Sequence, residues 1–385
     1  MKKVWDKWTR IALVKRILVG LILGAILGIA VPQATGIAIL GDVFVSALKA
    51  IAPLLVFFLV ISSLCNAGKS HGGVIKTVII LYMFSTVLAA VIAVFASMAF
   101  PVKMTLANAA TDTSAPQGIV EVLNNLLLNV VANPVSSLVN ANYVGILMWA
   151  VLLGLAFRAA DKMTKKVLAD VADGISMVVT WIINLAPFGI FGLVFNTVST
   201  NGLDIFTTYG KLLLLLVGCM LFIYFVTNPL LVYWCIRQNP YPLIFQCLKR
   251  SALTAFFTRS SAANIPVNMK VCEEMGLDRD TYSVTIPLGA TINMDGAAIT
   301  ITVMTMATAF TLGIHVDIPT AIILSLLAAL SACGASGVAC GSLLLIPMAC
   351  SLFGISDDIS MQVVAVGFII GVVQDSVETA LNSSS

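Results

Sequence analysis

Three acidic residues, Asp295, Asp375 and Glu378, lie inside the apolar segments near the carboxyl end of this sequence. Nearly every other Asp or Glu lies in a polar stretch or at the end of an apolar segment. A carboxylate at hydrocarbon depth costs about 2.5–3.5 kcal/mol on insertion scales, so an acid in such a place indicates a functional site. Because the surrounding backbone is also rich in Gly and Ser, the combination points to transport coupled to an ion.

The first of these acids belongs to a stretch, GATINMDG, in the middle of an apolar segment. Asn, Asp and Gly are poor helix formers, so the helix is expected to unwind here. Unwinding would release the carbonyls of Gly289 and Asn293 beside the Asn293 and Asp295 side chains, and a hard cation requires such oxygens. We expect Na⁺ or H⁺. The alternative is a plain kink in which Asp295 pairs with a basic residue, and the intramembrane candidates are Arg259 and Lys49.

The last apolar segment carries a polar stripe. Asp375, Glu378, Thr379 and Asn382 recur at i, i+3, i+4 and i+7, which places them on one helical face. Such a stripe on a membrane helix must face the protein interior or an aqueous cavity. A carboxylate beside an amide and a hydroxyl suits the ammonium and carboxylate groups of an amino acid. The alternative is a seam of hydrogen bonds between helices, which two acids on one face make less favoured.

A weaker polar cluster, Tyr82, Ser85 and Thr86, lies in the third apolar segment. Ser and Thr often pack between membrane helices, where small side chains let two backbones approach. Taken alone, this cluster is typical of helix packing.

Composition bounds the class of protein. Of 385 residues, 59% are hydrophobic and 10% charged, and the mean hydropathy is +1.04, which excludes an ordinary soluble domain. Apolar runs of about 18 or more residues recur along the chain and predict an all-α polytopic membrane protein. Eight Cys are scattered singly, and His71 and His315 lie at segment ends, so no metal cluster or Ser–His hydrolase is predicted. The net charge of +3 is spread over loops and indicates no nucleic-acid partner.

Ten apolar segments are expected. They cover 11–31, 37–66, 74–100, 121–157, 174–198, 211–236, 243–276, 282–312, 318–352 and 359–382. Basic residues gather before the first segment and in alternate loops, whereas the other loops carry only Lys103. This asymmetry predicts a cytoplasmic N-terminus.

Two segments are expected to return to the side on which they begin. Segment 243–276 has basic residues at both ends, segment 318–352 is flanked by acids, and each is interrupted in its middle, at 258–266 and 331–342. Pro and Gly interrupt helices, and paired interrupted segments indicate a transporter's binding site. We therefore predict two re-entrant hairpins; the alternative is two ordinary spans with surface-loop glycines.

Residues 258–382 resemble the dicarboxylate/amino acid:cation symporter family, with its glutamate-transporter-like fold. The resemblance is carried by Thr258-Arg259-Ser260-Ser261, by Asn293-Met294-Asp295-Gly296, by the Gly/Ser-rich second hairpin and by the polar stripe of the last segment. It implies a homotrimer in which each protomer has eight transmembrane helices plus two re-entrant helical hairpins. It also implies an elevator mechanism, with a scaffold at 1–73 and 121–200 and a moving transport domain at 74–120 and 201–385.

The resemblance assigns site residues one by one. For sodium it implies Tyr82, Ser85, Thr86, Gly289, Asn293, Asp295 and Asn382. For the substrate it implies Ser260, Ser261, Asp375, Glu378, Thr379 and Asn382, with Asp375 holding the α-ammonium and Ser261 and Asn382 the α-carboxylate. Family members carry a further sodium-ligating Asp four residues after the match to Asn382; this sequence ends at Ser385.

One departure from the family bears on the substrate. Transporters of acidic amino acids usually carry an Arg three residues after the match to Asp375, and here that position is Glu378. Two anions facing each other at low dielectric repel, so a small neutral amino acid with a hydroxyl group, which Thr379 or Glu378 could meet, is favoured. This pattern resembles the branch of the family that moves serine and threonine with sodium.

The sequence therefore predicts a multi-pass protein of the cell inner membrane, not an enzyme, that imports L-serine or L-threonine with Na⁺. It needs no cofactor besides the coupling ion, and its partners are the amino acid, Na⁺, the lipid bilayer and further copies of itself. The alternative is a Na⁺- or H⁺-coupled carrier of another small neutral amino acid or of a dicarboxylate. A channel and a membrane hydrolase acting through Ser260 or Ser336 are less favoured rivals.

Overall fold

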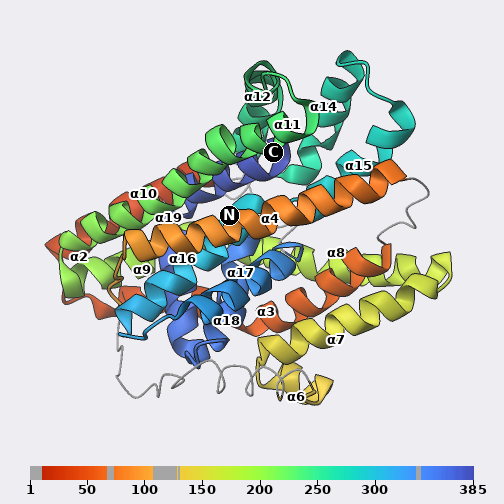
Figure 1. Cartoon of the computed structure of the whole chain (residues 1–385). Helices are drawn as coiled ribbons and strands as arrows, with labels where there is room; N and C mark the ends of the chain where they lie inside the picture. Colours follow the sequence, from red (N-terminus) through yellow and green to blue (C-terminus); the bar gives the residue numbers. More distant parts are fainter. Residues whose placement is uncertain (1–10, 67–72, 107–127, 129–130, 335–339) are drawn as a thin grey trace.

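The computed structural model describes residues 11–66, 73–106, 128, 131–334 and 340–385, and every regular element in these ranges is a helix (Figure 1). The first half comprises α2 (Leu13–Ala30), η1 (Thr35–Ala38), α3 (Ile39–Asn66), α4 (Gly73–Ala99), α6 (Pro134–Val139), α7 (Tyr143–Ala156), η2 (Phe157–Ala159), α8 (Lys162–Asn184) and α9 (Ala186–Asn201). The second half comprises α10 (Asp204–Phe222), η3 (Ile223–Thr227), α11 (Asn228–Ile236), α12 (Tyr241–Cys247), η4 (Leu248–Ala252), α13 (Leu253–Thr258), α14 (Ser261–Glu274), α15 (Arg279–Ile292), α16 (Asp295–Thr311), α17 (Ile318–Ala332), η5 (Gly341–Leu345), α18 (Ile346–Ser351) and α19 (Asp357–Ser384).

Several stretches are long and apolar enough to cross a membrane. Within the described ranges there are six: Thr35–Asn66, Lys76–Ala99, Lys162–Asn184, Ile205–Ile236, Arg279–Thr311 and Asp357–Ser384. In hydrocarbon, helices satisfy their backbone groups internally, which is why an apolar chain adopts them. The predicted class, an all-helical membrane protein, is confirmed.

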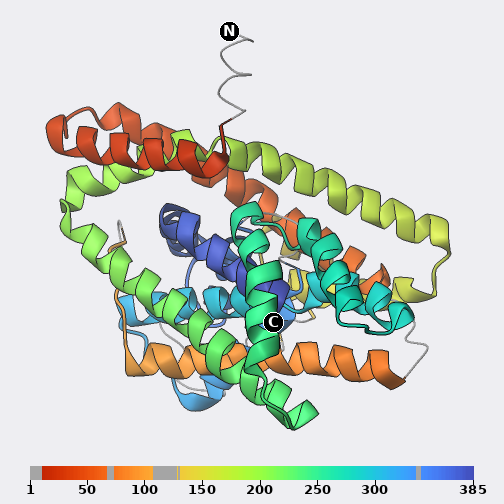
Figure 2. The same cartoon turned by 90° about the horizontal axis from the view of Figure 1, so that it is seen from above.

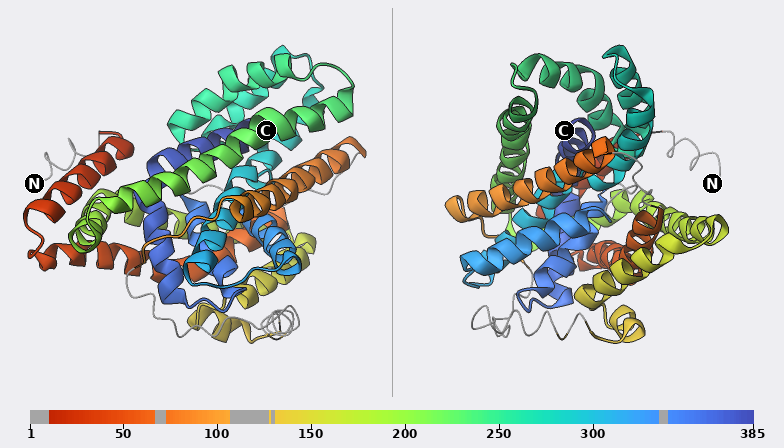
Figure 3. Two further views of the ribbon diagram at one scale, coloured as in Figure 1. Left: turned by 60° about the vertical axis from the view of Figure 1, so that its left-hand side comes forward. Right: turned by 45° about the vertical axis from the view of Figure 1, so that its right-hand side comes forward.

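The helices form two groups by their contacts. In the first, α2 packs on α9, and α3 packs on α7, α8 and α9; in the second, α16 packs on α4, α17 and α19, and α10 and α13 pack on α19. Red α2 and yellow-green α8 and α9 lie along one edge of Figure 2, and orange α4 lies along the opposite edge. In both views of Figure 3, blue α17 to α19 lie between green and teal α10 to α14 and yellow α6 and α7.

Helix α16 is the centre of the second group. All of its residues from Asp295 to Ala309 are buried, and its neighbours are α4, α10, α17, α18 and α19. A helix that is buried on every side lies in the core of a large protein. The buried acid at its first position is therefore held by protein on all sides.

The predicted unwinding before α16 is confirmed. Helix α15 ends at Ile292 and α16 begins at Asp295, because Asn293 (φ −88°, ψ 85°) and Met294 (φ −123°, ψ 46°) leave the helical region. One detail of the prediction is wrong: the Gly289 carbonyl is not released, since it accepts the Asn293 N–H at 2.9 Å. The last helical hydrogen bond of α15 therefore still includes the Gly289 carbonyl.

The interruption of segment 243–276 lies at its predicted place. Helix α13 ends at Thr258, Arg259 adopts a left-handed conformation (φ 52°), and Ser260 caps α14 through its hydroxyl, which accepts the Ala263 N–H at 3.2 Å. Helices α13 and α14 contact each other, so the chain turns back here. Pro266 does not interrupt α14, contrary to the prediction, because it lies within the helix.

The interruption of segment 318–352 is described only in part. Helix α17 ends at Ala332 and the next described element, η5, begins at Gly341. Residues 335–339, which include Ser336, lie outside the described residues.

Two predicted segments differ from the observed helices. Segment 121–157, where it is described, is divided into α6 and α7 at Ala141 (φ 51°), and the Asn142 side chain accepts the Gly145 N–H to start α7. Segment 174–198 is divided at Leu185, where α9 begins with Pro187 in its first turn. Hydropathy averages over such breaks, because capping residues and a first-turn proline interrupt a helix without lowering its apolar content.

Candidate binding site around three buried carboxylates

The three acids that the sequence singles out are all buried. Asp295, Asp375 and Glu378 are 0%, 3% and 4% exposed. Asp295 begins α16, and the other two lie on α19, which packs against α16. The structure thus brings the interrupted helix and the polar stripe to one place, and the partners of each acid differ.

Asp295 meets the polar cluster of α4. Its Oδ2 accepts a hydrogen bond from Ser85 Oγ at 2.7 Å, and its Oδ1 accepts one from Thr86 Oγ1 at 3.1 Å. The same Thr86 hydroxyl accepts the Met294 N–H at 3.3 Å and so fixes the unwound segment. Tyr82 lies nearby, with its hydroxyl 2.8 Å from the point where a Cβ on Gly289 would stand.

Asp295 has no basic partner among the described residues. The two candidates are engaged elsewhere: Arg259 pairs with Asp375, and Lys49 pairs with Asp357 and Asp358 at the start of α19. The alternative of a kink with a salt-bridged Asp295 is therefore wrong. The hydroxyl groups of Ser85, Thr86 and Ser385 stabilise this carboxylate, but they do not neutralise its charge.

Two asparagine side chains, Asn293 and Asn382, lie at the start of α16, near Asp295. Asn293 Nδ2 donates to Ser385 Oγ at 2.7 Å, while its Oδ1 is buried and has no hydrogen-bond partner in the described part of the chain. Asn382 Oδ1 accepts the Gly296 N–H at 2.7 Å, one of the amides left unpaired at the start of a helix. The lone buried oxygen of Asn293 marks an acceptor for which a cation is a suitable partner.

Gly296 allows α16 and α19 to approach closely. A Cβ at this position would lie 2.9 Å from the Glu378 carbonyl oxygen and 3.0 Å from its Cα. Backbone cannot yield as a flexible side chain can, so only glycine fits. This close approach sets the spacing between Asp295 and the acids of α19.

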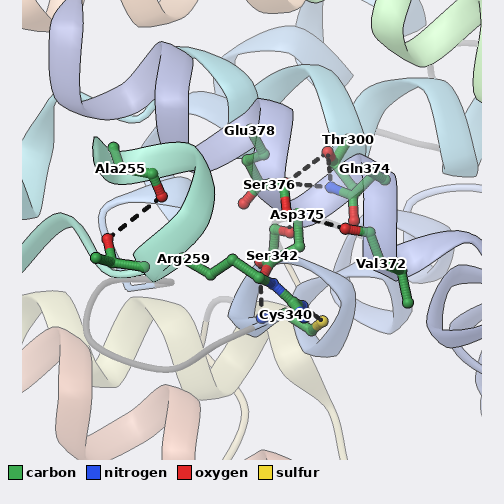
Figure 4. Close-up of polar contacts among 11 residues, drawn as sticks. Ala255, Arg259, Thr300, Cys340, Ser342, Val372, Gln374, Asp375, Ser376 and Glu378 are labelled. Carbon is green, nitrogen blue, oxygen red and sulfur yellow. Dashed lines mark hydrogen bonds and ion pairs between the residues drawn. The ribbon is translucent and has the colours of Figure 1, made fainter. Parts of the chain in front are cut away.

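Asp375 is held by a cation. Its Oδ2 accepts from Arg259 Nε at 2.6 Å, and its Oδ1 accepts the Cys340 N–H at 2.9 Å (Figure 4). Arg259 Nη2 also lies 3.2 Å from Cys340 Sγ. Arg259 and Cys340 both have positive φ, at 52° and 56°, a conformation that few non-glycine residues adopt. The carboxylate therefore ties the turn between α13 and α14, and the residue before η5, to α19.

Glu378 is held by neutral donors. Its Oε2 accepts from Thr300 Oγ1 at 2.7 Å, from Ser342 Oγ at 2.8 Å and from Gln374 Nε2. Figure 4 shows these side chains converging from α16, η5 and the preceding turn of α19. Gln374 Oε1 is buried without a hydrogen-bond partner among the described residues. Sequence reasoning missed all three donors; only Gln374, at i−4 on the same face, carried a usable signal.

The remaining predicted substrate residues lie around this cluster. Ser261 Oγ accepts a hydrogen bond from Ser383 Oγ at 3.1 Å, which joins the first turn of α14 to the end of α19. Ser260 is engaged as the cap of α14, and Thr379 is buried on α19 at 7% exposure. All the predicted site residues are thus described, and they lie on α4, α15, α16 and α19, at the start of α14 and in the break between α15 and α16.

The donor set fits a hard cation. No group of three or more His, Cys, Asp or Glu side chains that could hold a metal occurs in the described ranges. The oxygen atoms near Asp295 come from its own carboxylate, from the hydroxyls of Ser85, Thr86 and Ser385, and from the amide of Asn293. Such oxygens suit an alkali or alkaline-earth cation better than a transition metal, which favours nitrogen or sulfur ligands.

Comparison with known proteins identifies the family. A sequence model described as the sodium:dicarboxylate symporter family matches residues 13–385. The chain belongs to this family. It is therefore a transporter and not an enzyme, and the resemblance predicted from its motifs is confirmed.

Curated relatives match the chain along its whole length. A protein of Bifidobacterium adolescentis named serine/threonine transporter SstT is 58% identical over 100% of this chain and 90% of its own length. Proteins of the same name from two strains of Streptococcus thermophilus are 55% and 56% identical, over 100% of this chain and 96% of theirs.

Proposed function

We propose that this protein imports L-serine or L-threonine into the cell together with Na⁺. The observation that carries the proposal is a buried carboxylate, Asp295, that contacts hydroxyl groups and no cation among the described residues. A buried charge needs a partner, and in a symporter the transported ion supplies it. The names of the relatives support the amino acids.

Sodium is proposed to bind beside Asp295. The carboxylate supplies the charge, the free Asn293 Oδ1 supplies a neutral oxygen, and Ser85 and Thr86 turn their hydroxyl lone pairs to the ion. Tyr82, Gly289 and Asn382 complete the proposed set of residues, with Asn382 shared between ion and substrate. The cation would replace hydroxyl hydrogen bonds that satisfy the carboxylate without neutralising it.

The amino acid is proposed to bind against α19. Asp375 holds the ammonium group, Ser260, Ser261 and Asn382 lie at the carboxylate, and Thr379 and Glu378 meet the side-chain hydroxyl. The three donors to Glu378 all contact Oε2, so its other oxygen is the proposed acceptor for a serine hydroxyl. Arg259 contacts only one oxygen of Asp375, so ammonium binding requires the arginine to share or release that carboxylate.

A dicarboxylate carrier is the second candidate, because the family description names dicarboxylates and one cation, Arg259, lies at the cluster. Its guanidinium could pair with a second substrate carboxylate. Against this, Arg259 is engaged by Asp375, and Glu378 would repel an acidic side chain. Another small neutral amino acid, coupled to Na⁺ or H⁺, could also be the substrate if binding does not require the contact between a substrate hydroxyl and Thr379 or Glu378.

Transport is proposed to follow the family architecture. We infer eight transmembrane helices and two re-entrant hairpins in a trimer of the cell inner membrane, with the N-terminus in the cytoplasm. The scaffold comprises 1–73 and 121–200, and the elevator-like transport domain comprises 74–120 and 201–385. The grouping of helix contacts supports this division, since α2, α3, α7, α8 and α9 pack mainly on one another.

Coupling follows from linkage between the two sites. Asn382 contacts the start of α16 through Gly296, so an ion that orders this junction also orders the substrate residues of α19. The ion then raises amino-acid affinity, and by reciprocity the amino acid raises ion affinity by the same factor.

The test is uptake by purified protein in proteoliposomes. An inward Na⁺ gradient should drive serine accumulation, threonine should compete, and glutamate should have little effect. Calorimetry should detect serine binding in Na⁺ and much weaker binding in choline. Equal uptake with choline in place of Na⁺ would refute the coupling, and competition by glutamate or succinate but not threonine would favour the second candidate.

A further inference from the structure

A cavity of about 910 Å³ lies between the carboxyl-terminal part of α4 and α10, away from the three carboxylates. The two helices contact each other. The lining runs from Ile92 to Val102 on one side and from Lys211 to Phe222 on the other. We call this cavity the α4–α10 groove.

The groove is apolar and lies within membrane-spanning helices. It is flanked by outward-facing side chains that include Phe95, Leu214 and Phe222, which are 55%, 74% and 47% exposed. Both walls belong to stretches apolar enough to span a membrane, Lys76–Ala99 and Ile205–Ile236. Apolar walls of this kind suit a hydrocarbon chain, because burying apolar surface is favourable.

One charged side chain, Lys211, lines the groove among the described residues. It lies seven residues after the start of α10 at Asp204, or about 10 Å along the helix at 1.5 Å per residue. A lysine at that depth extends its apolar stem along the helix and places its ammonium toward the membrane interface. None of the ion pairs in the described ranges includes Lys211, so its charge is available to a ligand.

We propose that the α4–α10 groove binds an anionic phospholipid, with an acyl chain in the apolar hollow and the phosphate group against Lys211. The volume lies in the range of about 300–1,000 Å³ that is typical of small-molecule sites. A stable contact with another protein would instead need about 1,200–2,000 Å² of complementary surface. The apolar walls match the acyl chain of such a lipid, and the single cation near the interface matches its phosphate group. The proposal is independent of the transported solute.

Two glycines of α10 provide a matched pair of variants. A Cβ on Gly218 or on Gly210 would meet no atom within 4 Å, so both positions have room for a larger side chain. Gly218 lines the groove, whereas Gly210 does not. Gly218→Phe should therefore fill the groove. Gly210→Phe makes the same change of residue type on the same helix and should leave the groove open.

The experiment is native mass spectrometry of the full chain in detergent, with phosphatidylglycerol and phosphatidylcholine of identical acyl chains. Wild type and Gly210→Phe should retain phosphatidylglycerol in preference. Lys211→Gln should remove the preference while keeping some binding of both lipids, and Gly218→Phe should lower binding of both about tenfold, a change of about 1.4 kcal/mol. Equal retention of the two lipids by wild type, or full retention by Gly218→Phe, would overturn the proposal.

A second measurement needs no variant. Photoactivatable phosphatidylglycerol in membranes should label peptides within 92–102 and 211–222 of the unmodified chain, and excess unlabelled phosphatidylglycerol should prevent it. Labelling spread evenly over the other apolar helices would contradict a specific site. A loss of oligomer, without loss of lipid, in Gly218→Phe would instead identify the groove as a contact between copies of this chain.

Discussion

Asp295 and Asp375 are both buried carboxylates next to an interruption of the helical backbone, but their surroundings differ in charge. Asp375 contacts the guanidinium of Arg259 at 2.6 Å, whereas the side chains that donate to Asp295 in the described part of the chain are the hydroxyl groups of Ser85, Thr86 and Ser385. One charge is neutralised within the protein and the other is not. The difference indicates that Asp295 depends on a cation from outside the protein. It also distinguishes the proposed ion site at Asp295 from the proposed substrate site at Asp375.

The same comparison predicts different consequences for the same substitution. Removing one partner of a buried ion pair leaves an uncompensated charge and costs about 3–5 kcal/mol. Removing a buried carboxylate that has only neutral donors leaves no charge behind. Asp→Asn should therefore lower the stability of the fold strongly at 375 and little at 295, while the first change weakens serine binding and the second weakens Na⁺ binding.

Asp375→Asn is expected to have the largest effect. It should lower serine affinity by more than about 100-fold, since a charged hydrogen bond to ammonium is lost, and lower stability by about 3–5 kcal/mol because Arg259 is stranded. Calorimetry and thermal unfolding in detergent measure the two effects. The double variant Arg259→Gln/Asp375→Asn should recover most of the stability and none of the serine affinity. If Asp375→Asn alone is as stable as wild type, the ion pair with Asp375 is not needed to neutralise Arg259.

Asp295→Asn should act on sodium. We expect Na⁺ affinity to fall by about tenfold or more, equivalent to at least about 1.4 kcal/mol, with serine binding retained at saturating Na⁺. Binding of an ion to the folded state stabilises it by RT ln(1 + [Na⁺]/Kd), so wild type should melt at a higher temperature in NaCl than in choline chloride.

The variant should show a smaller difference at the same NaCl concentration and, in choline, melt near wild type, because no cation is stranded. A sodium-dependent shift in Asp295→Asn as large as that of wild type would place the ion elsewhere. Ser85→Ala serves as a control, since it removes one hydroxyl and keeps the charge.

The cost of burying polar groups explains what the sequence could predict. Asp295, the break before α16 and the polar face of α19 were visible because acids and poor helix formers interrupt an otherwise apolar sequence. The turn at Arg259 was visible for the same reason. A role for Ser85 and Thr86 could not be inferred from their spacing alone; it follows from their contacts with Asp295 in the structure.

Pairings between distant residues could not be predicted. Arg259 and Asp375 are 116 residues apart, and the spacing of neither reveals the other, so Arg259 remained a candidate partner of Asp295 until the contacts were known. Thr300 and Ser342 look like ordinary packing residues until they meet Glu378. The divisions at Ala141 and Leu185 were missed because helix caps are local events within apolar runs.

Glu378 provides an intermediate case that sharpens the comparison, since it is buried among three neutral donors like Asp295 but lies on the face of Asp375. Glu378→Gln should reduce the preference for serine over alanine by about three- to tenfold, or about 0.7–1.4 kcal/mol, a typical hydrogen-bond contribution. Competition against labelled serine uptake measures the preference.

The sodium-dependent melting shift should remain in this variant. If it disappears instead, Glu378 belongs with Asp295 in the ion site. Thr300→Val is the control for the donor network. It should lower serine affinity less than Glu378→Gln does, because Ser342 and Gln374 still donate to Glu378.

Lys49→Gln is expected to have the smallest effect and tests whether burial, and not ion pairing itself, distinguishes Asp375. Lys49 pairs with Asp357 at 3.0 Å and with Asp358 at 2.7 Å, but its side chain is 39% exposed, compared with 9% for Arg259. Exposed pairs contribute about 0–1 kcal/mol, because water solvates the partner that is left. Thermal unfolding should therefore place Lys49→Gln close to wild type. A loss as large as that of Asp375→Asn would mean that the contact between α3 and α19, and not the low dielectric around Arg259, sets the cost of breaking an ion pair in this protein.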